Sequence, residues 1–132
     1  MDDFNLCRFV TAQDPVFNDV ISELSSGRKS SHWMWFVFPQ LKGLGMSHYS
    51  QFYGISGSDE ALAYLNHALL GSRLKEVVSN LLMSNATNPE VIFGRTDAMK
   101  LKSSMTLFAS VDSSEEQTFK KCLDKFFFGM RD

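Results

Sequence analysis

The chain has 132 residues, which is enough for one folded domain and little else. Hydrophobic residues make up 44% and charged residues 21%, a globular composition that excludes a disordered chain and a fibre. The formal net charge of −2 argues against a non-specific nucleic-acid binder, which normally presents a strong positive field. Aromatic residues make up 13%, which supplies enough bulk for a core and for the lining of a pocket.

Cysteine usage and hydropathy both favour a cytoplasmic protein without a membrane anchor. Cys7 and Cys122 lie near opposite ends of the chain, so we expect two unpaired thiols in a reducing compartment. The acidic N-terminus is unlike a signal peptide. The longest apolar run, from Trp33 to Pro39, is far shorter than the roughly 20 residues that a membrane-spanning helix needs.

Apolar residues recur at helical spacing in the first part of the chain. Asp14-Pro15 predicts a helix start, the apolar residues from Phe17 to Leu24 repeat every three or four positions, and Gly27 predicts the end. The apolar run that ends at Pro39 fits either a buried strand or a short buried helix. The two serines before this run, Ser30-Ser31, favour the helix.

The glycine-rich segment 41–57 predicts a loop, and the chain after it is helical throughout. Caps and apolar periodicity place a helix from residue 58 that Asn66-His67 interrupts or bends, and further helices at residues 70–82, 88–94 and 96–108. The last helix begins at Ser113 or Ser114 and runs to Gly129. Strand-type alternation is nearly absent. We therefore predict an all-α fold over residues 1–132, a compact single-domain array of about five to seven helices with a Gly-rich loop.

Strong catalytic signatures are missing from the sequence. It contains no Walker loop, no dinucleotide-binding glycine motif, no zinc-protease motif and no nucleophile elbow. The three histidines, His32, His48 and His67, lack the spacing of metal ligands. We therefore expect neither a metal nor a cofactor.

The segment 28–40 carries the strongest functional signal. The polar residues around its two tryptophans are Arg28, Lys29, Ser31, His32 and Gln40. Cations at a helix N-terminus would hold an anion such as phosphate, while the indole of Trp33 or Trp35 would stack on a flat group. Residues two apart on a helix diverge, so one indole is expected to line a cleft or a second interface. The alternative is a core helix with a solvated basic flank.

Two later segments extend this chemistry. In Gly43-Leu44-Gly45-Met46-Ser47, the glycines would let backbone N–H groups approach a ligand and Ser47 could donate to a phosphate. An ordinary tight loop is the alternative. On a helix, Asp97, Lys100 and Ser104 share one face, so Lys100 could bind an anion or activate a serine while Asp97 orients it or acts as a base. The alternative is an intrahelical ion pair with serines bonded back to carbonyl groups.

These segments resemble the bacterial "domain of unknown function 1810" family, whose proteins are sometimes labelled calpastatin-like. The resemblance covers nearly the whole chain, and its most specific string is Ser-His-Trp-Met-Trp-Phe at residues 31–36. It implies a compact, mainly helical single domain and supplies no established activity. A calpastatin-type inhibitor is expected to be long, repetitive and disordered, unlike this chain. A more distant similarity is to the NADAR proteins, helical hydrolases that act on ADP-ribose-type conjugates.

Two departures from the family pattern are minor. Ala68 stands where the family usually has proline, so a softer turn is expected there. The chain also stops at Asp132, short of the apolar C-terminal tail that the resemblance leads us to expect in relatives.

Many motif positions of the family are polar, whereas a motif made only for packing would be apolar. The residues that we expect to bind a ligand are Arg28, Lys29, Ser31, Trp33, Trp35, Gln40, Ser47, Tyr64, His67, Arg73, Lys100, Ser103 and Ser104. His32 is the candidate acid/base, and Asp97 is the second candidate catalytic residue. The expected ligand is a small anionic molecule, nucleotide-like or ADP-ribose-like, with hydrolysis as the reaction if the site is catalytic.

The alternative is a non-catalytic interaction module or homodimerising adaptor. We expect neither a specific nucleic acid nor a membrane as partner. Ligand binding predicts that His32, Trp33, Arg73 and Lys100 converge on one concave pocket. The structural alternative predicts that these side chains are scattered, each with a local partner.

Overall fold

The structure is a computed structural model that describes residues 2–44 and 47–132. Its elements in chain order are α1 (Cys7–Gln13), α2 (Phe17–Ser25), α3 (Met34–Val37), α4 (His48–Phe52), α5 (Ser58–Asn66), α6 (Ala68–Met83), α7 (Pro89–Val111) and α8 (Thr118–Phe127). Extended pairing among these residues is limited to one isolated parallel bridge between Leu41 and Ile55. The all-α prediction is confirmed.

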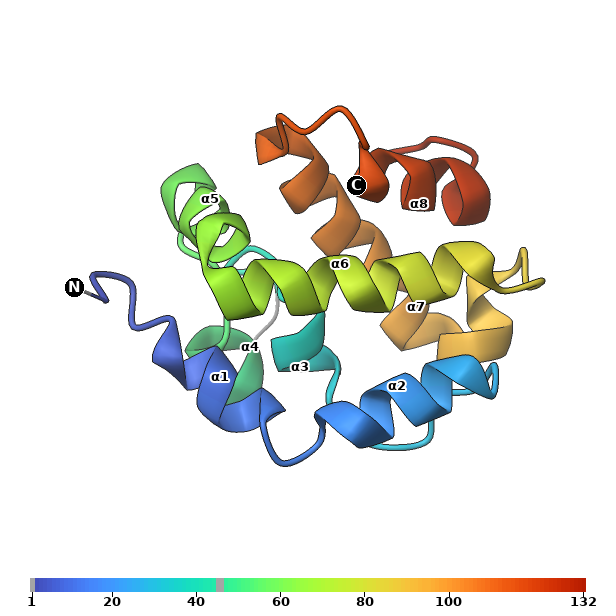
Figure 1. The fold of residues 1–132 in the computed structure, drawn as a ribbon, viewed down its shortest axis with the longest axis horizontal. Coiled ribbons are helices and arrows are strands. Elements are labelled where there is room, and N and C mark those ends of the chain that lie inside the picture. Colours follow the sequence, from blue (N-terminus) through green and yellow to red (C-terminus); the bar gives the residue numbers. More distant parts are fainter. Residues whose placement is uncertain (1, 45–46) are drawn as a thin grey trace.

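Helix α6 is the central element, because α2 packs on one side of it and α5 and α8 on the other (Figure 1). Its buried residues are Leu70, Gly71, Leu74, Val77, Val78 and Leu81, spaced by one, three or four positions. A Cβ atom at Gly71 would lie 2.1 Å from the carbonyl oxygen of Leu65, so only glycine permits this close approach of α5. No helix in the described part of the chain is long and apolar enough to cross a membrane.

Several predicted helix boundaries are confirmed. Asn66-His67 separates α5 from α6, and the His67 imidazole accepts hydrogen bonds from two backbone N–H groups in the first turn of α6, both at 3.2 Å. The side chain of Asn88 caps α7. Gly94 has non-helical dihedral angles (φ 76°, ψ 171°). It therefore divides α7 into a short first segment and a long second one, as the sequence predicts.

Two other boundaries differ from the prediction. Asp14-Pro15 lies in a turn between α1 and α2, and the N–H of Asp14 still bonds back to α1. The last helix begins at Thr118 instead of Ser113 or Ser114, because Gln117 has a left-handed conformation (φ 49°) that no helix can contain.

The prediction of an uninterrupted loop over residues 41–57 is wrong, because the short helix α4 lies within it. The Ser47 hydroxyl accepts a hydrogen bond from the N–H of Ser50 at 3.1 Å and caps this helix. Most of α4 is exposed, so it has no apolar face that periodicity could reveal. Gly45 and Met46 of the predicted ligand loop lie outside the described residues.

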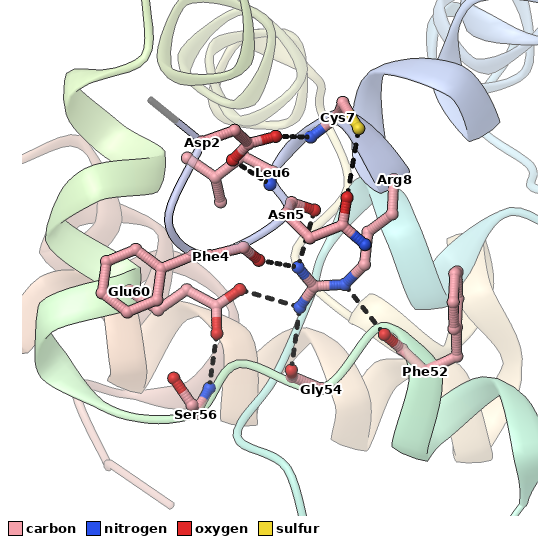
Figure 2. A network of polar contacts seen from close by, with 10 residues as sticks. All are labelled: Asp2, Phe4, Asn5, Leu6, Cys7, Arg8, Phe52, Gly54, Ser56 and Glu60. Carbon is pink, nitrogen blue, oxygen red and sulfur yellow. Dashed lines mark hydrogen bonds and ion pairs between the residues drawn. The ribbon is translucent and has the colours of Figure 1, made fainter.

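The Arg8 guanidinium joins the N-terminal segment to the α4–α5 connection (Figure 2). Its five N–H groups donate to five acceptors: the carbonyl oxygens of Phe4, Asn5, Phe52 and Gly54 and the carboxylate of Glu60. The ion pair has an N–O distance of 2.7 Å, and its side chains are 9% and 4% exposed. The second Glu60 oxygen accepts from the N–H of Ser56. This buried network fixes α1 against the connection.

Replacing Arg8 with methionine is expected to lower the free energy of unfolding by about 3 kcal/mol, because it leaves the buried Glu60 carboxylate without its cation. Urea denaturation measures this loss. Lys121 is exposed, and its side chain has no partner among residues 2–44 and 47–132, so Lys121→Met should stay within about 0.5 kcal/mol of the wild type. A loss below about 1 kcal/mol in Arg8→Met would contradict the role assigned to the network.

Candidate functional site

The carboxylate of Glu23, near the end of α2, organises the segment between α2 and α3. Its oxygens accept hydrogen bonds from the N–H of Ser30 (2.7 Å), the N–H and hydroxyl of Ser31 (2.9 and 2.6 Å) and the indole of Trp33 (3.0 Å). Ser30-Ser31 therefore donates to Glu23 and does not cap the following helix. That helix is the single turn α3, which begins only after Trp33.

This arrangement lowers the pKa of the Glu23 carboxyl group. Partial burial of Glu23 opposes its ionisation, but the hydrogen bonds from Ser31, Ser30 and Trp33 outweigh burial and lower its pKa from 4.5 to about 2. The segment that contains the family string is thus held by a permanent negative charge near neutral pH. Glu23 is not among the residues predicted from the sequence. The feature of the sequence that could have indicated its role is a single acidic residue near the end of a predicted helix, followed a few residues later by two serines and a tryptophan that can donate hydrogen bonds.

Two lysines and Asp97 lie beside the tryptophans. Asp97 accepts from the ammonium of Lys29 at 2.9 Å and from that of Lys100 at 3.3 Å. The Lys29 nitrogen lies 5.0 Å from the Trp33 ring centroid, and the Lys100 nitrogen lies 3.5 Å from that of Trp35. Trp33 is buried (1% exposed), whereas Trp35 is half-buried. The structure therefore brings these five predicted residues together, and the two indoles diverge as expected.

A pocket of about 430 Å³ adjoins this cluster. It is lined by Gly27, Arg28, Lys29, Glu90, Val91, Ile92, Phe93 and Gly94. Gly27 and Gly94 both have positive φ (83° and 76°), and a Cβ atom at either would meet no atom within 4 Å. The side-chain positions of both glycines are therefore open space, close to the cationic side chains of Arg28 and Lys29 in the lining. The backbone N–H of Lys29 donates to the Ile92 carbonyl at 2.8 Å and joins the two walls.

Arg28 and Lys29 differ in how fully their charges are engaged. The Lys29 ammonium donates to Asp97 and to the Ser31 carbonyl oxygen, and its side chain is 8% exposed. The Arg28 side chain is exposed, and the described residues supply no hydrogen bond or ion pair to it. Glu90 is the acidic residue of the lining. Arg28 is therefore the cation available to an incoming anion.

Tyr64 and Arg73 belong to a separate network around Gln13. The Gln13 amide nitrogen donates to the Tyr64 hydroxyl at 3.0 Å and to the Phe36 carbonyl at 2.7 Å. Arg73 donates to Gln13 at 3.4 Å and pairs with Asp14 at 2.8 Å. Burial raises the pKa of the Tyr64 phenol, which therefore stays protonated. These contacts join α1, α3, α5 and α6. Arg73 therefore belongs to this network and not to the group formed by Lys29, Asp97 and Lys100.

The remaining predicted residues have their recorded contacts elsewhere. Ser47 and His67 cap α4 and α6. Ser103 donates to the carboxylate of Asp132, and Ser104 is buried with no partner for its hydroxyl among the described residues. The Gln40 carbonyl accepts from Ile55, and its side chain is half-buried.

His32 is exposed, and the structure records no hydrogen bond of its imidazole among the described residues. It immediately precedes Trp33 in the chain, whose indole is held by Glu23. The residues expected to converge are thus divided: Trp33 and Lys100 belong to one cluster, Arg73 belongs to another network, and His32 faces solvent.

No group of three or more histidine, cysteine or acidic side chains in the described ranges could hold a metal ion. A larger pocket, of about 740 Å³, lies between α7 and α8 and contains none of the predicted residues. The site with the predicted chemistry is therefore not the most spacious one.

Comparison with known proteins gives two matches. A family model described as "Protein of unknown function (DUF1810)" matches residues 3–132. The crystal structure of the conserved hypothetical protein Rv1873 from Mycobacterium tuberculosis superposes with a TM-score of 0.96 at 50% sequence identity, over 99% of this chain and 93% of that one. No curated protein matches the chain. These matches do not show the similarity to the NADAR proteins, which stays a prediction.

The wild-type protein should lose stability relative to a Glu23→Gln variant as the pH falls from about 4.5 to 2. The folded-state pKa of Glu23 lies below its ordinary value, so the ionised carboxylate stabilises the fold above pH 4.5, and protonation removes this contribution on acidification. Thermal unfolding of both proteins across this pH range measures the difference. A gap between them that is constant over the range would contradict the assigned role.

Proposed function

We propose that this chain, which belongs to the DUF1810 family of proteins of unknown function, binds a small anionic ligand in the pocket lined by Gly27, Arg28, Lys29 and Gly94. The observation that carries the proposal is the combination, in one pocket, of an unpaired exposed guanidinium with two glycines whose side-chain positions are open space. Arginine is a usual donor to phosphate and carboxylate groups in proteins. The backbone N–H groups of Gly27 and Lys29 already donate to the carbonyl oxygens of Leu24 and Ile92, so the glycines contribute space for the anion next to Arg28.

The proposed position of the anion is next to Arg28, with the paired charges of Lys29 and Asp97 further away. Glu23 and Asp97 are already paired with donors, and Lys29 is held by Asp97 on the pocket wall. A phosphate would therefore gain its direct ion pair from Arg28 and a longer-range attraction from the Lys29 ammonium. Glu90, on the same lining, favours a singly or doubly charged group over a highly charged one.

The tryptophans support a ligand with a flat group attached to the anion. Lys29 connects the pocket to Asp97, which in turn connects to Lys100 above Trp35. Part of the Trp35 surface is exposed, whereas the Trp33 indole is buried and bonded to Glu23. Of the two indoles, Trp35 is therefore the one proposed to stack on a ring attached to the anion, outside the pocket lining and on the part of its surface that Lys100 leaves uncovered. A nucleotide or an ADP-ribose-like molecule has the required anion and flat ring.

Hydrolysis is the reaction that we propose if the site is catalytic. The imidazole of His32 is exposed four residues after Arg28 in the chain, so it is the proposed acid/base. Both oxygens of Asp97 accept from ammonium groups, which suits a residue that orients Lys100. The two free cysteines suit the reducing cytoplasm that we propose as the location.

A non-catalytic interaction module or homodimerising adaptor is the second candidate function. Exposed aromatic side chains on α4 favour it, because Tyr49 and Phe52 are 57% and 46% exposed.

Arg28→Ala should weaken binding of inorganic phosphate and of ADP-ribose at least tenfold, because one charge-assisted hydrogen bond contributes about 1.5–3 kcal/mol. Isothermal titration calorimetry measures the affinity. Lys121→Ala removes one exposed cation outside the pocket and should bind as the wild type does. If phosphate, AMP, ADP and ADP-ribose at millimolar concentration all fail to bind and to raise the Tm of the wild type, the proposal is wrong.

His32→Ala should abolish turnover of ADP-ribose-type substrates while leaving their dissociation constants within about twofold, since the imidazole is assigned to proton transfer alone. Chromatography of reaction mixtures detects the products. Turnover that is equal in His32→Ala and in the wild type would remove His32 from the mechanism and leave the binding proposal unaffected.

A further inference from the structure

The groove between α7 and α8 is apolar along most of its wall and open to solvent. Its volume is about 740 Å³, within the range of pockets that enclose a small ligand. Met99, Phe126, Phe127 and Met130 contribute to its lining. Met99 and Met130 are 65% and 57% exposed, so the isolated chain leaves this apolar surface uncovered. Covering it with an apolar group would be favourable.

Phe128 extends the apolar wall just beyond the end of α8. Its side chain is 90% exposed and lines the groove. Its backbone is left-handed (φ 55°, ψ 31°), a conformation that is unfavourable for an aromatic residue. The backbone N–H groups of Phe128 and Gly129 both donate to the Leu123 carbonyl oxygen and hold the turn. An ordered turn therefore forms this end of the groove.

Two cationic residues of α7 lie on either side of Met99. Arg95 and Lys102 both line the groove, about one helical turn before and after this methionine. The Arg95 side chain is exposed, and that of Lys102 is half-buried. Within residues 2–44 and 47–132, neither side chain has a hydrogen bond, an ion pair or an aromatic ring as partner. Both charges are therefore available to an anion in the groove.

The acidic residues of the lining do not cancel these charges. Asp124 already pairs with the Lys120 ammonium at 3.1 Å, so Glu90 is the acid of the described lining that has no ion pair. Lys125 adds a positive charge, because its ammonium donates to three carbonyl oxygens at the end of α6 and to no described carboxylate. The excess of positive charge in the lining favours an anion of low charge.

An apolar wall with unpaired cations beside it suits a molecule that has both an apolar part and an anionic part. A neutral apolar molecule would gain nothing from Arg95 and Lys102. A highly charged anion would leave the apolar wall uncovered and would be repelled by Glu90. A carboxylate carries a single charge, and methionine side chains such as that of Met99 adapt to apolar chains of different shape.

We propose that the α7–α8 groove binds a small amphipathic carboxylate, a molecule in which an unbranched apolar chain ends in one carboxylate group. The chain lies against Met99 and Met130, and the carboxylate pairs with Arg95 and Lys102. This site goes beyond the anion pocket at Arg28, with which its lining shares only Glu90.

NMR titration of the full chain, labelled with ¹³C at the methionine methyl groups, tests the proposal. The probes are hexanoate, octanoate and decanoate, each well below the concentration at which it forms micelles. Octanoate should shift the methyl signals of Met99 and Met130. Met83 is the internal control, since it is 85% exposed but does not line the groove, and its signal should stay unchanged. The affinity should rise about threefold for each CH₂ group added to the chain.

The double variant Arg95→Gln/Lys102→Gln should bind octanoate about tenfold more weakly or worse, because it removes both partners of the carboxylate. It should also lose the preference of the wild type for octanoate over octanol. Lys42→Gln/Lys121→Gln is the matched control, since it removes two exposed cations outside the lining, and it should bind octanoate as the wild type does. Thermal unfolding checks that both double variants are folded.

Unchanged signals of Met99 and Met130 at millimolar decanoate would overturn the proposal. So would a wild type that binds octanol as tightly as octanoate, because the cations would then have no part in recognition. Shifts of Met83 as large as those of Met99 would also overturn it, since the probes would then coat the surface without a specific site. Binding of phosphate at Arg28 has no bearing on any of these outcomes.

Discussion

The Glu23 carboxylate is the interaction on which the arrangement of the candidate site depends. Four hydrogen bonds converge on it from Ser30, Ser31 and Trp33, three residues in the connection between α2 and α3. It fixes the Trp33 indole in the core and sets where the backbone before it can run. The path of that backbone brings Lys29 to Asp97 and leaves Arg28 at the pocket. One acid on α2 thus determines which of two adjacent cations is buried.

Positive and negative side chains alternate in the series of contacts Lys29–Asp97–Lys100 near the site. Asp97 holds Lys29 and Lys100, and each lysine also lies near a tryptophan ring, a combination that stabilises a cation in a partly desolvated position. Because these charges already compensate one another, they shape the pocket but do not dominate the binding of an anionic ligand. Arg28 differs from these lysines, because the described residues supply no ion pair to its guanidinium. The same contrast separates Arg8, whose five donors are all engaged, from Arg28, whose guanidinium finds no acceptor in the part of the chain that the structure describes.

The sequence predicted the long helices well because their apolar faces are regular. Helix α6 has buried residues at helical spacing, and Gly94 marks the kink of α7 as expected. Short exposed α4 has no such face and was missed. In the candidate site, residues close in sequence or on one helix turn were grouped correctly, as with Asp97 and Lys100. Arg73 and Tyr64 were grouped wrongly with them, because spacing along the chain does not say which neighbouring helix a side chain meets. Glu23 was missed for the same reason.

The central claim is that an anion with an attached ring occupies the Arg28 pocket, and NMR titration of ¹⁵N-labelled protein with inorganic phosphate and with ADP-ribose tests it most directly. Phosphate should shift the backbone amides of Gly27 and Gly94, and ADP-ribose should in addition shift the Trp35 indole N–H. The Trp33 indole, bonded to Glu23, should not move in either titration. Unchanged signals of both glycines at millimolar concentrations of both ligands would contradict the account.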